Sequence, residues 1–387
     1  MRRVLRGIGY FVLGLLVASA IAELGFHTVE ATPLRFVLPV SEIALYGPDS
    51  HTGYRHRAGA RGMWLTENRA DIAISSLGLR DRERSLVRTS GLRVVVVGDS
   101  LIEAVQVPLE STAVAIAEKR VAARKPGTEV INLGLAGAGP PVIAARLQSL
   151  GSELQPDLAI AVVNVSNFGA PILRDDSAFT GYRASPDGSA HLSYGFRNGR
   201  GYKIRTSAIG LALYWTLDHS ALARVLNSRK NIGLFSEWPQ HLPQAPRQDA
   251  CTSSKTELTS LLSLWRDGEP KIASTVIDAF IRDLAKINAS SKPAVIVMAD
   301  GFPRPCSDSS ESRNELVEIV KRRFAAQGLP SADLNMLMAG EYGTAETSGL
   351  RGFRSKIGRG HFNEQGNNVL GNVLAELILQ WAPPGRR

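Results

Sequence analysis

The feature that most constrains the fold is an alternation of short β-branched runs with longer segments of helical spacing. Strands are predicted at 93–97, 129–133, 158–165 and 293–299. Strands that alternate with helices of this length form a parallel sheet covered on both faces. The sequence therefore predicts an α/β protein, a three-layer α/β/α sandwich with a central parallel sheet. Helices are predicted at 109–123, 141–154, 275–288, 310–327 and 364–381.

Two parts of the chain depart from this alternation. Residues 27–90 are rich in glycine, arginine and short polar stretches, and we interpret them as an extended membrane-proximal segment. Residues 168–270 carry turn signals and one apolar helical stretch at 209–226, and we interpret them as an insertion in a domain that spans 91–387. Such an insertion forms either a lid or substrate wall, or a subdomain without a role in the site.

The N-terminus has the pattern of an export signal. Three arginines within the first six residues precede an apolar run, 8–22, that ends at Glu23. This run is shorter than the roughly 20 residues that span a bilayer, although residues 24–26 could extend it into a tilted span. Small-x-small sequences within 18–22 leave a cleaved signal peptide open. We favour an uncleaved anchor over residues 1–26, with the following domain in the periplasm or outside the cell.

Charge and cysteine usage exclude several classes of protein. The formal net charge is +9, but the basic residues are scattered or lie near the chain ends, so no nucleic-acid partner is predicted. Anionic surfaces of the cell envelope are the expected neighbours. Cys251 and Cys306 can close one disulfide in an exported protein, and two buried free thiols are the alternative. No Cys/His cluster has the spacing of a zinc site, so no metal is predicted.

Three candidate site elements follow predicted strands. Ser100, after the strand 93–97, would present its hydroxyl beyond the sheet and its own N–H to a developing oxyanion. Gly137, in a glycine-rich turn, would bring a second backbone N–H close to a reacting carbonyl. Asn167, just past the third strand, would add a side-chain amide. Each element also has a plain structural interpretation as a turn or a cap.

A histidine completes the set. His361 lies in Gly-His-Phe-Asn immediately before the C-terminal helix 364–381, at the entry to the last element of the sheet layer. From that loop an imidazole can reach a serine at the top of the first strand. A single histidine before a helix is more often structural, but the other histidines of this chain do not follow a regular α/β unit in this way.

In order and spacing these residues resemble the four blocks of the SGNH (GDSL-type) hydrolase family. The resemblance rests on Gly98-Asp99-Ser100-Leu101, on Asn132 to Gly137, on Asn167, and on His361 to Gly366. It covers about residues 75–167 and 290–381. The segment Ser75 to Asp81 is also similar to the Asn-x-Gly-x-Arg-type segment of membrane-anchored bacterial members.

The resemblance implies a flavodoxin-like SGNH hydrolase fold with no cofactor. It implies Ser100 as the nucleophile and His361 as the general base. The oxyanion hole would consist of the Ser100 and Gly137 amides with the Asn167 side chain.

Two departures from the family pattern concern the site. Family members carry an aspartate two or three residues before the histidine, where this chain has Arg359 and Gly358. Asp308 and Glu346 are candidates for the missing acid, and a Ser-His dyad is the alternative. The third block reads Val-Ser-Asn-Phe over 165–168 instead of Gly-x-Asn-Asp, although Asn167 is retained.

These features predict a serine esterase that acts through an acyl-enzyme on an ester of the cell envelope, an O-acetyl glycan or a lipid. An O-acyltransferase that uses the same site is an alternative. A degenerate SGNH domain serving as a binding or assembly module is another, because the acid is missing locally. The oligomeric state stays open.

Overall fold

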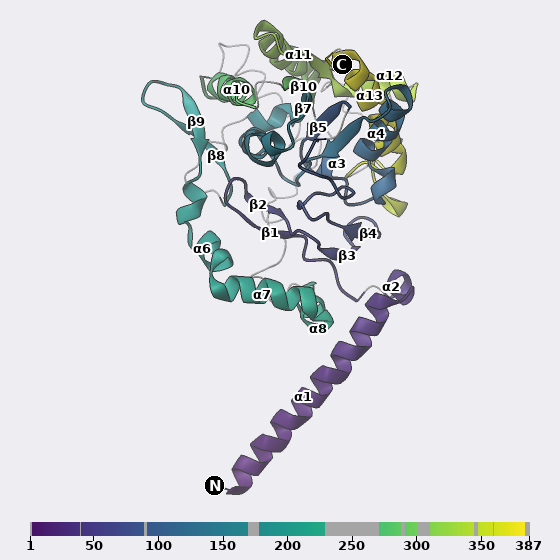
Figure 1. Cartoon of the computed structure of the whole chain (residues 1–387), viewed down its shortest axis with the longest axis vertical. Helices are drawn as coiled ribbons and strands as arrows, with labels where there is room; N and C mark the ends of the chain where they lie inside the picture. Colours follow the sequence, from purple (N-terminus) through teal and green to yellow (C-terminus); the bar gives the residue numbers. More distant parts are fainter. Residues whose placement is uncertain are drawn as a thin grey trace.

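A computed structural model describes residues 2–38, 40–88, 91–168, 178–228, 271–287, 291–299, 310–343, 347–358 and 360–383. Cys251 and Cys306, the predicted disulfide pair, lie outside these ranges, as do Asp308 and Glu346. The chain begins with a long helix, α1 (Arg2–Ala31), and a single helical turn, α2 (Leu34–Val37). Both project from one side of the main body (Figure 1).

A five-stranded parallel sheet forms the centre of the molecule. Its order is β11-β10-β7-β5-β6, and every neighbouring pair is parallel. This is the flavodoxin-like order, in which the chain reverses its direction of travel across the sheet between β5 and β7. All four predicted strands lie within one residue of their observed bounds, whereas β11 is too short to produce a pattern. The strands are β5 (Arg93–Val97), β6 (Glu129–Asn132), β7 (Leu158–Asn164), β10 (Lys292–Met298) and β11 (Ser331–Asp333).

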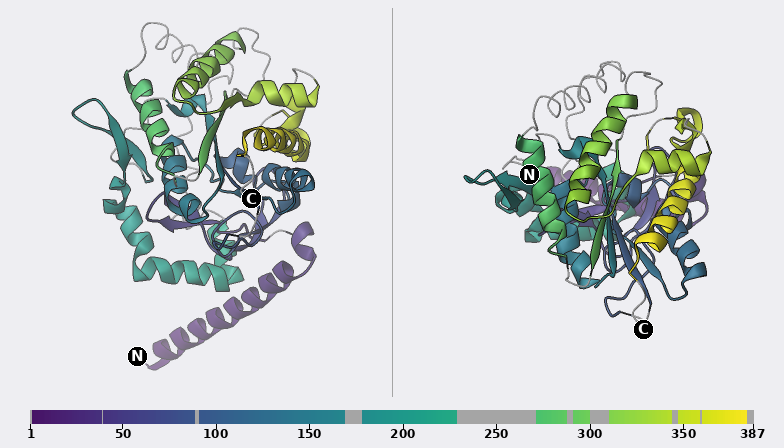
Figure 2. Two further views of the ribbon diagram at one scale, coloured as in Figure 1. Left: turned by 45° about the horizontal axis from the view of Figure 1, so that its top comes forward. Right: turned by 90° about the horizontal axis from the view of Figure 1, so that it is seen from above.

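Helices cover both faces of the sheet, as the right view of Figure 2 shows. Val94 and Val96 of β5 pack on the face covered by α4 (Ala113–Arg124), α12 (Leu334–Tyr342) and α13 (Glu364–Trp381). Val95 and Val97 pack on the face covered by α5 (Pro140–Arg146), α10 (Lys271–Leu284) and α11 (Ser310–Ala326). The side-chain alternation of a strand therefore gives two apolar cores, and the predicted three-layer α/β/α sandwich is confirmed.

Four short strands lie in the predicted membrane-proximal segment, where no periodic pattern indicated them. β1 (Tyr46–Asp49) pairs with β2 (Gly53–His56), and β3 (Arg61–Trp64) pairs with β4 (Ala70–Ala73), both antiparallel. Leu45, Tyr54, Trp64 and Ile72 are buried in the same core as β5. Four-residue strands are too short for alternation to stand out, but their side chains make this segment part of the globular body.

The described part of the predicted insertion is a hairpin followed by helices. The hairpin is β8 (Gly181–Ala184) with β9 (Ala190–Ser193). Three helices, α6 (Arg200–Thr206), α7 (Ala208–His219) and α8 (Ala221–Ser228), then run along the side of the body from which α1 projects (Figure 1). The predicted apolar helical stretch at 209–226 therefore corresponds to α7 and α8.

Side chains cover the free edge of β6. Asp81 accepts a hydrogen bond from the Asn132 N–H at 2.8 Å, and Arg84 donates to the Val130 carbonyl at 2.9 Å. Glu118 of α4 accepts from the Val130 N–H at 3.2 Å and pairs with Arg84 at 2.6 Å. An edge strand with unpaired backbone groups can recruit another strand. These three charged side chains bond to backbone groups of β6 and so hinder such pairing.

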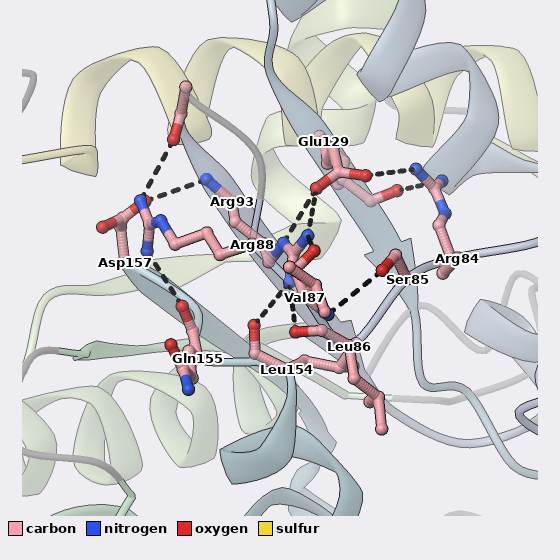
Figure 3. Close-up of polar contacts among 12 residues, drawn as sticks. Arg84, Ser85, Leu86, Val87, Arg88, Arg93, Glu129, Leu154, Gln155 and Asp157 are labelled. Atoms are coloured by element: carbon pink, nitrogen blue, oxygen red, sulfur yellow. Dashed lines mark hydrogen bonds and ion pairs between the residues drawn. The ribbon is translucent and has the colours of Figure 1, made fainter.

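The amino ends of the strands are held by a second ionic network, drawn in Figure 3. The buried Arg93 guanidinium pairs with Glu129 at 2.7 Å and donates to the Leu154 carbonyl at 3.0 Å. Asp157 accepts from the Arg93 N–H at 2.9 Å and from Arg88 at 2.5 Å. This network lies at the sheet edge opposite the carboxyl ends of the strands, where a parallel sheet binds ligands.

Candidate active site

Ser100 and His361 meet at the carboxyl edge of the sheet. His361 Nε2 lies 2.8 Å from Ser100 Oγ, which is hydrogen-bond distance. The two residues are 261 positions apart in the chain. The sequence-predicted pair is therefore brought together by the fold in the geometry that a general base needs toward its nucleophile.

A tight turn presents Ser100 after β5. A side chain at Gly98 would place its Cβ 2.6 Å from Ile102 and 3.2 Å from Val162, so only glycine fits. Asp99 caps the following helix, α3 (Ser100–Glu103), by accepting from the Leu101 N–H at 2.9 Å. α3 is a single turn, followed by Ala104 in the left-handed region (φ 53°), so the helix dipole at Ser100 is small.

The loop before α13 holds His361. The His361 carbonyl accepts a hydrogen bond from the Gly352 N–H at 2.9 Å. Two residues later, the Asn363 N–H donates to the Leu350 carbonyl at 3.0 Å. Asn363 also caps α13 by accepting from the Gly366 N–H at 2.9 Å. The imidazole is thus carried on a backbone fixed at both sides.

Glu67 supplies the carboxylate that the sequence pattern lacked near the histidine. Its Oε2 lies 3.0 Å from His361 Nδ1 and 3.1 Å from the His361 backbone N–H. A carboxylate at Nδ1 keeps the proton on that nitrogen and leaves Nε2 free to accept the Ser100 proton. The Ser-His dyad considered from the sequence is therefore a Ser-His-Glu arrangement.

The pKa values of both partners respond to this contact. Burial lowers the pKa of His361, but the hydrogen bond and charge of Glu67 outweigh it and raise that pKa above its ordinary value. Burial raises the pKa of Glu67, but the hydrogen bonds and charge of His361 outweigh it and hold that pKa below its ordinary value. The contact therefore favours a charged Glu67 carboxylate and a protonated His361 imidazole.

The backbone around Glu67 is arranged for this contact. Glu67 has a φ of 66°, in the left-handed region that residues with side chains seldom adopt. The preceding residues are held by Glu42, which accepts from the N–H groups of Leu65 and Thr66 at 3.0 and 3.1 Å. A Cβ at Gly360, where φ is 84°, would lie 2.8 Å from both carboxylate oxygens of Glu67. Glycine at 360 thus makes room for the acid.

No sequence signal pointed to Glu67. It precedes the segment that resembles the family, and its loop has no periodicity. Of the two positions where family members carry the acid, Gly358 has no side chain and Arg359 lies outside the described residues. The acid therefore comes from the loop between β3 and β4, 294 residues before the histidine.

The predicted oxyanion donors lie at the same edge of the sheet. Gly137 is in the turn after β6, with φ 72°, and Asn167 is in a 3-10 turn, Val165–Phe168, directly after β7. Within the described part of the chain, the backbone N–H groups of Ser100 and Gly137 have no hydrogen-bond acceptor. Their availability fits the predicted oxyanion role, which stays a prediction for all three residues.

Side chains from the first hairpin hold the turn that carries Gly137. Tyr54 of β2 donates to the Ala136 carbonyl at 2.5 Å, and Glu103 of α3 accepts from the Ala136 N–H at 3.1 Å. Glu103 is fully buried and also accepts from His56 at 2.6 Å and Tyr46 at 2.7 Å. The predicted membrane-proximal segment therefore supports the site in two places, through Glu67 and through this buried cluster.

No protein-family model and no curated protein matches the sequence. Solved structures match at low identity. LAE5, an α/β hydrolase enzyme from the metagenome of Lake Arreo, Spain, is 14% identical, with 76% of this chain and 97% of that chain covered and a TM-score of 0.35. A lipase/acylhydrolase from Enterococcus faecalis is 15% identical, with 76% and 100% covered and a TM-score of 0.34.

An acetylxylan esterase from Geobacillus stearothermophilus is 12% identical, with 75% of this chain and 94% of that chain covered and a TM-score of 0.34. The strand order of the chain's own sheet shows the flavodoxin-like α/β/α fold.

Proposed function

We propose that this protein is a serine esterase of the SGNH type, with Ser100 as nucleophile, His361 as general base and Glu67 as the residue that orients the base. The observation that carries the proposal is the continuous set of contacts from Ser100 Oγ through the imidazole to the Glu67 carboxylate. It lies beyond the carboxyl ends of β5 and β7, where the strand order reverses and α/β proteins bind ligands.

The reaction would proceed by acyl transfer to the serine. Ser100 Oγ attacks the ester carbonyl carbon while His361 Nε2 takes the hydroxyl proton, and the amides of Ser100 and Gly137 with the Asn167 side chain stabilise the oxyanion. His361 then protonates the departing alkoxide, leaving an acyl-enzyme. A water molecule, deprotonated by the same imidazole, releases the acid and restores Ser100.

The contact with Glu67 weakens the degenerate-domain alternative. That alternative was based on the missing local acid, and a carboxylate now lies at His361 Nδ1. Hydrolysis and acyl transfer use the same acyl-enzyme and differ only in the second acceptor, so product analysis with added alcohol acceptors separates them. The substrate class we propose is an ester of the cell envelope, either an O-acetyl glycan or a lipid.

We also propose that α1 anchors the protein in the cytoplasmic membrane with the α/β domain on the outer side. α1 is a continuous helix of 30 residues, about 45 Å long at 1.5 Å per residue. It is long and apolar enough to cross a membrane, and none of its apolar stretch is buried inside the protein. The arginines at its start favour a cytoplasmic N-terminus. Finding the full-length protein in the cytosolic fraction would contradict this part of the proposal.

The catalytic proposal is tested by turnover of p-nitrophenyl acetate by the full chain in detergent. We expect Ser100→Ala and His361→Ala to lower kcat by on the order of 10³-fold or more. Ser76→Ala and His51→Ala, two exposed residues outside the site, are the matched controls and should retain activity. Equal background rates for the wild type and both site variants would contradict esterase activity toward this substrate.

A further inference from the structure

The helix α7 is apolar on nearly all sides. Gly210, Tyr214 and Leu217 form its buried face, which packs with Ala44 against the body of the protein. Its other faces carry large apolar side chains in solvent, with Trp215 62% exposed and Ile209 73% exposed. Leu211 and Leu213 are exposed beside them. A helix with this many exposed apolar side chains marks a surface that contacts a membrane or another protein.

α7 is fixed beside the point where the apolar run of α1 ends. Glu23 of α1 caps the next helix, α8, by accepting from the N–H groups of Ala221 and Leu222 at 2.8 and 2.9 Å. Arg224 of α8 pairs with Glu30 of α1. In Figure 1 and in the left view of Figure 2, α7 lies between the main body and the N-terminal part of α1. The buried face of α7 is toward the body, so its exposed face is toward the N-terminal part of α1.

We infer that the exposed face of α7 lies in the interface of the same bilayer that α1 spans, so that the protein contacts the membrane at two places. This inference rests on the proposed α1 anchor. A helix parallel to the membrane surface buries its apolar side chains among the acyl chains near the headgroups, and tryptophan is enriched at that depth. Trp215 occupies such a position on α7.

Exposed basic side chains lie on the helix that precedes α7. Arg200 and Lys203 of α6 are exposed immediately before α7. Positive charge beside an apolar helix attracts the anionic headgroups of a bilayer. A second protein copy would not by itself require this pairing of apolar and basic surface, and we therefore choose the lipid bilayer as the partner.

The contact also connects the membrane to the site region. Arg57, which follows β2, donates to the carbonyls of Tyr214 and Ala44 at 3.2 and 2.8 Å. The same hairpin carries Tyr54, which holds the Ala136 turn. α7 in the bilayer interface would thus fix the height and orientation of the α/β domain through the hairpin that supports the site.

The test uses tryptophan fluorescence of the full chain in vesicles that contain anionic lipid and acyl chains brominated either near the headgroup or near the chain end. The fluorescence of Trp215 is obtained as the difference between the emission of the wild type and that of the Trp215→Phe variant. We expect this difference to be quenched by the shallow bromines more than by the deep ones, and its emission to shift to the blue. Trp381→Phe, at the end of α13, is the control and should leave the quenching unchanged.

A second reporter separates this inference from the anchor. Leu16→Trp, placed in the Trp215→Phe variant, should be quenched by the deep bromines if α1 spans the bilayer. Quenching of this introduced tryptophan in α1 without quenching of the Trp215 contribution would overturn the inference for α7 and leave the anchor intact. A Trp215 contribution that is shifted to the blue but unquenched would mean that protein covers α7, which also overturns it. No quenching at either position would contradict the anchor itself.

Discussion

The Glu67 carboxylate lies 3.0 Å from His361 Nδ1, although the two residues are 294 positions apart in the chain. The acid comes from a loop between two short hairpin strands, and the base comes from the loop before the last helix. The segment that follows the proposed membrane anchor therefore supplies the third member of the proposed Ser-His-Glu set. The α/β layer alone would contain only the serine and the histidine.

Removing the charge of Glu67 should slow the reaction strongly. In Glu67→Gln the amide cannot stabilise the His361 imidazolium, and it can hold the His361 ring in the wrong tautomer. We therefore expect kcat/KM to fall by roughly 10²- to 10⁴-fold. Glu83→Gln is the matched control, because Glu83 is in the same segment but accepts hydrogen bonds from Ser76. Full activity in Glu67→Gln would exclude Glu67 from the mechanism.

The pH profile should report the same contact. In the proposed mechanism the neutral form of His361 is the active base. Burial lowers the pKa of His361, but Glu67 outweighs this effect and raises that pKa above the ordinary 6.5. The acid limb of kcat/KM should therefore lie above pH 6.5 in the wild type and move to lower pH in Glu67→Gln. A limb that stays in place in the variant would mean that Glu67 does not set the pKa of His361.

Gly360 should be needed for the position of the acid. In Gly360→Ala the new methyl group would meet the Glu67 carboxylate at 2.8 Å and displace it from the imidazole. We expect a decrease in kcat of about tenfold or more, equivalent to about 1.4 kcal/mol. In the double variant with Glu67→Gln the two losses should not add.

Gly358→Ala is the control for backbone strain at Gly360. Gly358 has a similar φ of 87°, but a Cβ there would make only an ordinary contact, 3.8 Å from Ser348. Equal losses of activity in the two alanine variants would attribute the effect at 360 to strain instead of to displacement of the acid.

Tyr54 should act on the chemical step through the Ala136 turn. Tyr54→Phe removes the 2.5 Å hydrogen bond to the Ala136 carbonyl and frees the turn that carries Gly137. We expect kcat to fall about tenfold with KM nearly unchanged, since the oxyanion forms only after binding. Loss of stability should be about 1 kcal/mol. A change in KM alone would contradict a role in positioning the turn.

The covered edge of β6 should contribute to stability and not to catalysis. Arg84→Met leaves Asp81 and Glu118 without their shared cation near the edge strand, and both carboxylates are at least partly buried. We expect the free energy of unfolding to fall by about 3 kcal/mol, as when one partner of a buried ion pair is removed. Denaturant unfolding measures this effect, and a loss below about 1 kcal/mol would contradict it.

The sequence alone determined the layered α/β architecture and the serine–histidine pair. Val94 to Val97 and the apolar positions of 364–381 encode their elements locally, because strand and helix periodicities involve residues close together in the chain. The sequence indicates Ser100 and His361 because each lies next to such an element. Their meeting at 2.8 Å follows from the common edge at which parallel strands end.

Only the tertiary structure decided which carboxylate lies against His361 and how the segment before the sheet packs. Glu67, Asp81 and Glu103 make their contacts with residues from other elements, and the polar pairs they form leave no periodic pattern in the chain. An ion pair or a buried hydrogen bond depends on the distance between two atoms in the folded protein. Sequence spacing does not fix that distance when long segments with their own turns lie between the partners.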